Sequence, residues 1–160
     1  MNKVLLSLGS NIGNKIVNLE KAKSLIEAVK GINLLAASSY YKSEPYGFKD
    51  QDWFINNCLL IETKIVATDL LKILKNIEIE IGRKPRQKWH EREIDIDIIL
   101  YAAQIINSKL VQIPHPEMHK RNFVLFPAVE IASSMMHPTL NLSVKELKDI
   151  SKDKSKVLLN

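Results

Sequence analysis

Apolar residues recur at two spacings along this chain, and these spacings predict where its strands and helices lie. Short apolar or alternating runs predict strands, whereas apolar residues three and four positions apart predict helices. The strands are expected at residues 3–9, 32–42, 53–65 and 93–101, and the helices at residues 15–30, 69–81, 122–132 and 143–152. Gly31 and Gly82 are expected to end the first two helices, because glycine accepts a left-handed backbone. Thr68 is expected to cap the second helix.

The first six elements follow the order strand, helix, strand, strand, helix, strand. This βαββαβ order is typical of a ferredoxin-like fold of the α+β class, in which an antiparallel sheet carries both helices on one face. The other face is left for ligand, covered in part by loops and by a C-terminal extension of short strands and helices. Because the chain has 160 residues and no internal repeat or linker, we expect one domain, residues 1–160.

Composition narrows the class of protein further. Hydrophobic residues make up 46% of the chain and charged residues 26%, as in ordinary globular proteins rather than disordered or collagen-like ones. No apolar run approaches the ~20 residues that span a bilayer, and the N-terminus becomes polar too early for a signal peptide. We therefore expect a cytoplasmic protein. Cys58 is the one cysteine and lies in an apolar run, so it is expected to be a small buried residue.

The net charge of +5 is concentrated in two short segments, residues 83–92 and 115–122. Residues 83–92 hold five basic side chains and one acidic side chain. A protein that coats nucleic acid spreads its positive charge over a face. A concentrated charge favours a compact anionic ligand such as a polyphosphate.

Two carboxylates alternate with isoleucines in the predicted strand 93–101. Residues two apart in a strand point to one face, so Asp95 and Asp97 lie together while Ile94, Ile96 and Ile98 face the core. One interpretation is a half-solvated strand with a polar outer face. The other is a cation site, because like charges on one face repel each other and carboxylates with phosphate oxygens suit Mg²⁺.

Three further features suit a bound nucleotide, although each also has a structural interpretation. Arg83 and Arg92 bracket the basic loop, and guanidinium groups match phosphate oxygens in pairs. Trp89 has no local apolar surface to bury against, so it closes onto a core or covers a flat ligand. His115 lies between two prolines and close to Arg121, where phosphate contact and a structural role are both open.

The strand at 53–65 carries groups that suit a planar heterocycle. Phe54 and Asn56 share a face of that strand, so one offers a ring for stacking and the other a carboxamide with donor and acceptor edges. An ordinary aromatic cluster in the core would give the same pattern.

Taken together, these segments resemble the 6-hydroxymethyl-7,8-dihydropterin pyrophosphokinase family over residues 1 to about 135. The matching motifs are L-x-L-G-S-N at 6–11, S-S-Y-Y-K-S-E-P-Y-G at 38–47, F-I-N at 54–56, E-x-x-x-G-R at 78–83, W-x-x-R-x-I-D-I-D-I at 89–98 and P-H-P-x-M-x-x-R-x-F at 114–123. Glu44 departs from the family, because this loop position is often uncharged there.

The resemblance implies a ferredoxin-like enzyme that moves the terminal two phosphates of ATP to the hydroxymethyl group of the pterin and releases AMP. It implies two Mg²⁺ ions on Asp95 and Asp97, and catalytic roles for Arg83, Arg92 and Asp97. The nucleotide would lie along Glu78, Lys84, Trp89, Arg92, His115 and Arg121. The pterin would contact Ser43, Glu44, Pro45, Tyr46, Phe54, Asn56, Asp95 and Phe123. A monomer with these two small-molecule substrates is expected, without nucleic acid or membrane partners.

Two alternatives belong to other classes. An RNA-binding module on the same fold would stack bases on the aromatic residues and hold phosphates with the basic loop. The chain lacks the sequence signature of such modules, and two aspartates facing the ligand would repel a phosphate backbone. A metal-dependent phosphatase would instead hydrolyse ATP without pterin.

Overall fold

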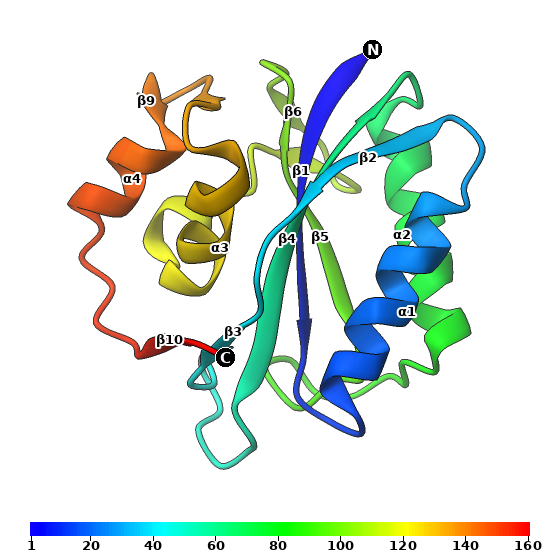
Figure 1. Cartoon of the computed structure of the whole chain (residues 1–160), viewed down its shortest axis with the longest axis vertical. Coiled ribbons are helices and arrows are strands. Elements are labelled where there is room, and N and C mark those ends of the chain that lie inside the picture. Colours follow the sequence, from blue (N-terminus) through cyan, green and yellow to red (C-terminus); the bar gives the residue numbers. More distant parts are fainter.

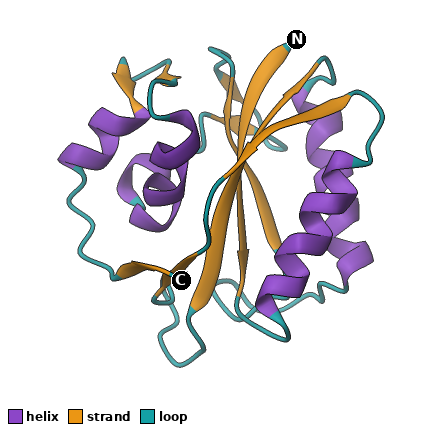
Figure 2. Ribbon diagram, in the orientation of Figure 1, coloured by secondary structure: helices purple, strands orange, loops and turns teal.

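A six-stranded antiparallel sheet separates two pairs of helices, α1 with α2 on one face and α3 with α4 on the other (Figures 1 and 2). The computed structural model describes residues 1–160. The strands run in the order β10-β3-β4-β1-β5, and β2 also pairs with β4. The bounds are β1 Asn2–Ser10, α1 Lys15–Glu27, β2 Ile32–Ala37, β3 Tyr41–Ser43, β4 Phe54–Thr63, α2 Ala67–Ile81, β5 Asp95–Tyr101, β6 Ile106–Asn107, β7 Gln112–Ile113, α3 Asn122–Ala132, β8 Met136–His137, β9 Leu142–Ser143, α4 Val144–Ile150 and β10 Val157–Leu159.

The predicted ferredoxin-like α+β fold is confirmed, with one strand divided. Residues 32–42 form two strands, β2 and β3, which both pair with β4. Between them the Ser38 hydroxyl accepts the backbone N–H of Cys58 at 2.9 Å, a donor that would otherwise bond to a strand neighbour. This side-chain bond interrupts the ladder, because serine competes with backbone acceptors.

Two helix boundaries differ from the sequence predictions. Helix α2 begins at Ala67 after Val66, so Thr68 lies inside the helix and the predicted threonine cap is wrong. Helix α1 ends at Glu27, four residues before Gly31. Gly31 has a φ of +94° and therefore serves the turn into β2 rather than the helix end. Gly82 ends α2 in the left-handed conformation, as predicted.

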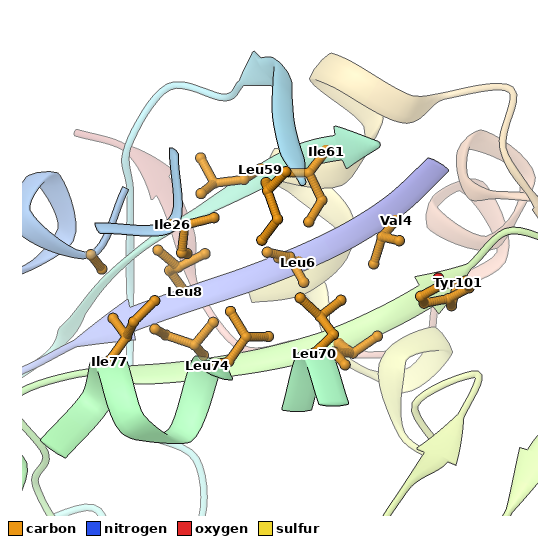
Figure 3. Close-up of a cluster of buried hydrophobic side chains, with 14 of the residues drawn as sticks. Val4, Leu6, Leu8, Ile26, Leu59, Ile61, Leu70, Leu74, Ile77 and Tyr101 are labelled. Carbon is orange, nitrogen blue, oxygen red and sulfur yellow. The ribbon is translucent and has the colours of Figure 1, made fainter. Parts of the chain in front are cut away.

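Strand β1 is buried on both sides, and its alternation organises two cores. Val4, Leu6 and Leu8 point toward α1 and α2, where they pack with residues of β4 and α2 (Figure 3). Leu5 points to the opposite face and joins the core beneath α3 and α4. Helices therefore cover both faces of the sheet. Only the end of the sheet where β1 finishes is left for a ligand.

Cys58 belongs to the second core and is fully buried, as the sequence predicted. Burial raises the pKa of its thiol far above the ordinary value, and no second cysteine exists to pair with it. None of the helices has the length and apolar character required to cross a bilayer.

Truncating the centre of the first core should destabilise the chain strongly. Leu6 is fully buried, so Leu6→Ala removes buried carbon atoms and leaves a cavity that costs about 2–5 kcal/mol of unfolding free energy. Val17 on α1 is 55% exposed, so Val17→Ala should change the same quantity by less than about 0.5 kcal/mol. Urea unfolding measures both variants, and equal losses would contradict this assignment of the core.

Candidate active site

A pocket opens at the end of the sheet where β1 finishes and β4 and β5 begin. Four strands, two loops and the start of α3 contribute to it, and this convergence of distant segments is typical of a ligand site. Its lining residues are Ser7, Gly9, Ser43, Glu44, Tyr46, Phe54, Asn56, Trp89, Arg92, Asp95, Asp97, Arg121 and Phe123.

The structure brings most of the sequence-predicted site residues to this pocket. Eleven of the lining residues are among the candidates, and Ser7 and Gly9 are the two that sequence reasoning missed. Five candidates lie outside the lining: Pro45, Glu78, Arg83, Lys84 and His115. The Lys84 side chain is exposed, whereas Glu78 lies buried behind the pocket wall and bonds to the partly exposed Arg83, as described below.

Ser7 and Gly9 form the floor beneath the aspartates. They pair across the sheet with Asp97 and Asp95 respectively. Because Leu6 and Leu8 point toward the helices, Ser7 and Gly9 point to the other face. A leucine fills the equivalent place at Leu5, so the change to small residues marks where the second core ends and the pocket begins.

Asp95 is held by two guanidinium groups. Arg83 Nη1 donates to Asp95 Oδ1 at 2.9 Å, and Arg92 Nη1 donates to Asp95 Oδ2 at 2.9 Å. Burial disfavours the charged carboxyl, but the positive charges of Arg92, Lys75 and Arg83 outweigh it and hold the pKa of Asp95 below its ordinary value. Asp95 is therefore ionised at neutral pH.

Asp97 has no such partner, although it lies on the same face of β5. Burial and the neighbouring charge of Asp95 raise the pKa of Asp97 to about 7. Two carboxylates side by side, of which one lacks a protein cation, form a donor set that fits Mg²⁺.

Glu78 connects helix α2 to this charge network. Its side chain is 4% exposed, and Oε1 accepts from Arg83 Nη1 at 2.7 Å. Oε2 accepts from the backbone N–H of Ile96 at 2.7 Å and from Lys75 Nζ at 3.0 Å. Glu78 therefore fixes Arg83 and the strand that carries the aspartates without entering the pocket itself.

Aromatic rings form the opposite wall. Phe54 at the start of β4 and Phe123 at the start of α3 both line the pocket. The Arg121 guanidinium lies 5.0 Å from the centre of the Tyr46 ring, 5.6 Å from Trp89 and 5.8 Å from Phe123. At these distances the cation interacts with the ring faces, so Arg121 stands where a flat ligand would meet the same rings.

The Asn56 carboxamide has a defined orientation. Its Nδ2 donates to Ser43 Oγ at 2.6 Å, and both residues are buried. A Cβ on Gly9 would lie 2.8 Å from Asn56 Oδ1, so only glycine leaves room for this amide. Oδ1 receives no hydrogen bond from the protein and lies in the pocket lining, where it presents an acceptor to a ligand N–H.

The two loops beside the pocket contact each other. The rings of Tyr46 and Trp89 are 5.3 Å apart between centroids, and those of Phe48 and His90 stack at 4.1 Å. A Cβ on Gly47 would lie 2.8 Å from the Trp89 ring, so glycine permits this close contact. Loop 43–52 therefore covers the Trp89 ring, for which the sequence showed no local apolar surface.

His115 lies behind the pocket as a neutral imidazole. Burial and the positive charge of Arg121 lower its pKa to about 4. Its Nδ1 accepts the N–H of Glu117 at 3.1 Å, which leaves the proton on Nε2 as a donor.

Fold and pocket together define a class: a metal-assisted phosphotransferase that pairs a polyphosphate with a planar heterocycle. The comparisons with known proteins agree with it. The family model described as 7,8-dihydro-6-hydroxymethylpterin-pyrophosphokinase (HPPK) matches residues 5–133.

The relatives and solved structures extend this match. The 2-amino-4-hydroxy-6-hydroxymethyldihydropteridine pyrophosphokinase of Aquifex aeolicus is 40% identical over 92% of this chain and 91% of its own length. The protein of the same name from Haemophilus influenzae is 37% identical over 93% of both. The wild-type HPPK-DHPS crystal structure of Plasmodium falciparum with STZ-DHP has a TM-score of 0.74 and 17% identity. This chain spans 43% of that solved chain, and the likeness shows the fold.

The chain therefore belongs to the 7,8-dihydro-6-hydroxymethylpterin-pyrophosphokinase family. It is an ATP-dependent transferase that passes a pyrophosphoryl group to 6-hydroxymethyl-7,8-dihydropterin in folate synthesis, as the resemblance implied. Enzymes of this family use ATP as co-substrate, generally with Mg²⁺. The RNA-binding alternative has no support in these comparisons and is set aside.

Removing the Ser43 hydroxyl should weaken pterin binding. In Ser43→Ala the buried Nδ2 of Asn56 loses its acceptor, and an unpaired buried donor costs about 1–3 kcal/mol. The amide then turns, and the Michaelis constant for the pterin should rise about tenfold, equivalent to about 1.4 kcal/mol, while that for ATP stays unchanged. Ser43→Thr keeps the hydroxyl and should stay near the wild type. An unchanged pterin constant in Ser43→Ala would contradict the role of this bond.

His115 should make the chain less stable in mild acid. Its folded pKa lies below the ordinary value, so its stabilising contribution is complete above pH 6.5 and is lost as the pH falls through 4. Between pH 8 and pH 5 the wild type should lose about 2 kcal/mol of unfolding free energy that His115→Asn does not lose. Urea unfolding at the two pH values measures this difference, and parallel losses would contradict a neutral His115.

Proposed function

We propose that the pocket divides into a metal and phosphate half on β5 and a pterin half between Phe54 and Phe123. One observation carries this proposal: the alternation of β5 directs Asp95 and Asp97 into the same pocket that Phe54, Asn56 and Phe123 line. A carboxylate pair with an aromatic slot suits a triphosphate beside a flat ring.

In this proposal Asp95 and Asp97 hold two Mg²⁺ ions together with ATP. Bound Mg²⁺ would neutralise charge on the phosphate oxygens. The support is the carboxylate pair itself, in which Asp97 has no protein cation and Asp95 is ionised. Asp95 lines the same pocket as the residues of the pterin half, which supports its predicted contact with the pterin.

Arg83 and Arg92 stabilise the transferring group, with Asp97 as the third catalytic residue. Each arginine bonds Asp95 through Nη1 only, so its Nη2 is free to bind a phosphate oxygen. Glu78 keeps Arg83 in place from behind the wall. Paired guanidinium donors match phosphate geometry, so both residues serve the charge that builds up during transfer.

The nucleotide lies along the basic loop and the start of α3. Trp89 and Arg121 border the pocket directly, while His115 approaches from behind it. Lys84 completes the nucleotide contacts through an exposed side chain that can swing toward the phosphates. Glu78, which the resemblance also placed along the nucleotide, is buried with both oxygens bonded to protein groups, so its part is to hold Arg83. Arg121 leaves the aromatic rings when a phosphate offers it a stronger charged partner.

The pterin stacks between Phe54 and Phe123, and its polar edge meets Asn56 Oδ1. The loop Ser43–Tyr46, which includes Glu44 and Pro45, closes the slot from one side. Glu44 and Tyr46 line the pocket, whereas Pro45 is buried behind them. The edge that Asn56 reads must carry an N–H, because the carboxamide offers an acceptor there.

The reaction is an in-line displacement. The pterin hydroxyl oxygen bonds to the β-phosphorus as the bond between that phosphorus and the oxygen of the α-phosphate breaks. AMP leaves with that oxygen, and the hydroxyl proton passes to solvent water. Such transfers depend on positioning and on charge neutralisation rather than on a covalent intermediate. The residues described above supply both.

We also propose that the chain acts as a monomer and a single domain, residues 1–160, in the cytoplasm. Strand β1 contributes to both hydrophobic cores and to the pocket floor, which supports a single domain.

An assay of AMP release from ATP tests the function directly. AMP should form only when both 6-hydroxymethyl-7,8-dihydropterin and Mg²⁺ are present. In Asp97→Asn the rate should fall at least about 100-fold, because one metal ligand loses its charge. The unfolding free energy above pH 7 should not fall, since a carboxylate whose pKa is raised opposes folding when ionised.

Asp69→Asn is the matched control, because Asp69 is an exposed residue of α2 far from the pocket lining. It should retain wild-type AMP release. ADP as the product, or AMP without pterin, would refute the proposed reaction, and full activity in Asp97→Asn would refute the metal site.

A further inference from the structure

The pterin slot is the space between Phe54 and Phe123, with the loop Ser43–Tyr46 on one side and the start of α3 on the other. Residues 151–160, called here the 151–160 segment, contact both of these sides. The segment lies beyond the family match, which ends at residue 133. Its strand β10 pairs with β3, where Val157 lies opposite Ser43. In Figure 1 the segment runs from α4 back to the edge of the sheet beside β3.

Glu44 joins the loop side of the slot to this segment. Its backbone N–H donates to the carbonyl oxygen of Lys156 at 3.2 Å. Its Oε1 accepts the backbone N–H of Lys156 at 2.9 Å. Glu44 is charged at a position that is often uncharged in the family. In this chain its carboxylate accepts a hydrogen bond from a backbone N–H, that of Lys156.

Asp153 joins the segment to the helix side of the slot. Its Oδ2 accepts the N–H of Asn122 at 2.8 Å, and its carbonyl oxygen accepts Asn122 Nδ2 at 3.0 Å. Asn122 begins α3 between Arg121 and Phe123, so Asp153 satisfies a free helix N–H next to two pocket residues. Oδ1 accepts from the N–H and hydroxyl of Ser155, which fixes the carboxylate.

The segment adds little to the hydrophobic cores. None of its residues is buried, and Leu158 and Leu159 are 56% and 68% exposed. Its specific bonds instead concentrate at the two sides of the slot. A segment of this kind contributes position more than stability.

We propose that the 151–160 segment sets the width of the pterin slot, with Glu44 and Asp153 as positioning residues. Glu44 holds the loop that carries Ser43 and Tyr46, and Asp153 holds the start of α3 that carries Phe123. The inference rests on the proposed pterin subsite. It assigns Glu44 an effect on the ring through the segment, in addition to its place in the pocket lining.

The test measures steady-state constants for Asp153→Ala, Glu44→Ala and the double variant. Each single change removes hydrogen bonds worth about 1 kcal/mol, so the Michaelis constant for the pterin should rise about fivefold. The turnover number and the Michaelis constant for ATP should stay within about twofold of the wild type. Because both changes release the same connection, the double variant should rise about fivefold to eightfold rather than the roughly 25-fold of independent effects.

Conservative and control variants sharpen the result. Asp153→Asn and Glu44→Gln keep an acceptor oxygen and should recover most of the pterin affinity. Asp149→Ala removes an exposed carboxylate of α4 that pairs only with Lys145, so it should match the wild type. The melting temperature accompanies every measurement, and it should fall by less than about 3 °C.

Multiplying effects in the double variant, or an unchanged pterin constant in Asp153→Ala, would overturn the proposal. So would equal losses in the pterin constant, the ATP constant and the melting temperature, since these would show a general structural role. Failure of the underlying function is separate, because the wild type would then release no AMP with pterin and Mg²⁺.

Discussion

Electrostatic repulsion between Asp95 and Asp97 is the constraint on which the site depends. Strand alternation places both carboxylates on one face, and burial makes their mutual repulsion expensive. Arg83 and Arg92 neutralise the charge of Asp95, and Glu78 holds Arg83 in turn. Asp97 is left without a cation of its own. A further positive charge beside Asp97 would relieve the repulsion that remains, and this is the physical basis of the proposed Mg²⁺ site.

The location of the site follows from how β1 is covered. Along one face the strand passes from Leu5, beneath α3, to Ser7 and Gly9, beneath the pocket. The opposite face stays apolar, with Val4, Leu6 and Leu8, and anchors the sheet to α1 and α2. The sheet therefore extends to the pocket as its floor, and loops 43–52 and 83–92 lie at the edge of that floor.

Local sequence patterns predicted most strands and helices and most of the pocket residues. They could not predict the register and the hydrogen bonds between segments that are distant in the sequence. The alternation of β5 and the pairing of Phe54 with Asn56 on one face are properties of single strands. Ser7 became visible as a pocket residue only through its register with Asp97. Glu78 carried an available signal, because a carboxylate beside the apolar stripe of α2 must find buried partners. The break at Ser38 depends on a hydrogen bond to β4, which local periodicity cannot reveal.

The lone thiol of Cys58 gives the chain a built-in reporter of opening. It is fully buried in the core between the sheet and α3, and burial raises the pKa of its thiol. Alkylating reagents require the exposed thiolate. Labelling of the native protein would therefore proceed only when the layer containing α3 separates from the sheet. The labelling rate would report how often this opening occurs, without any engineered probe.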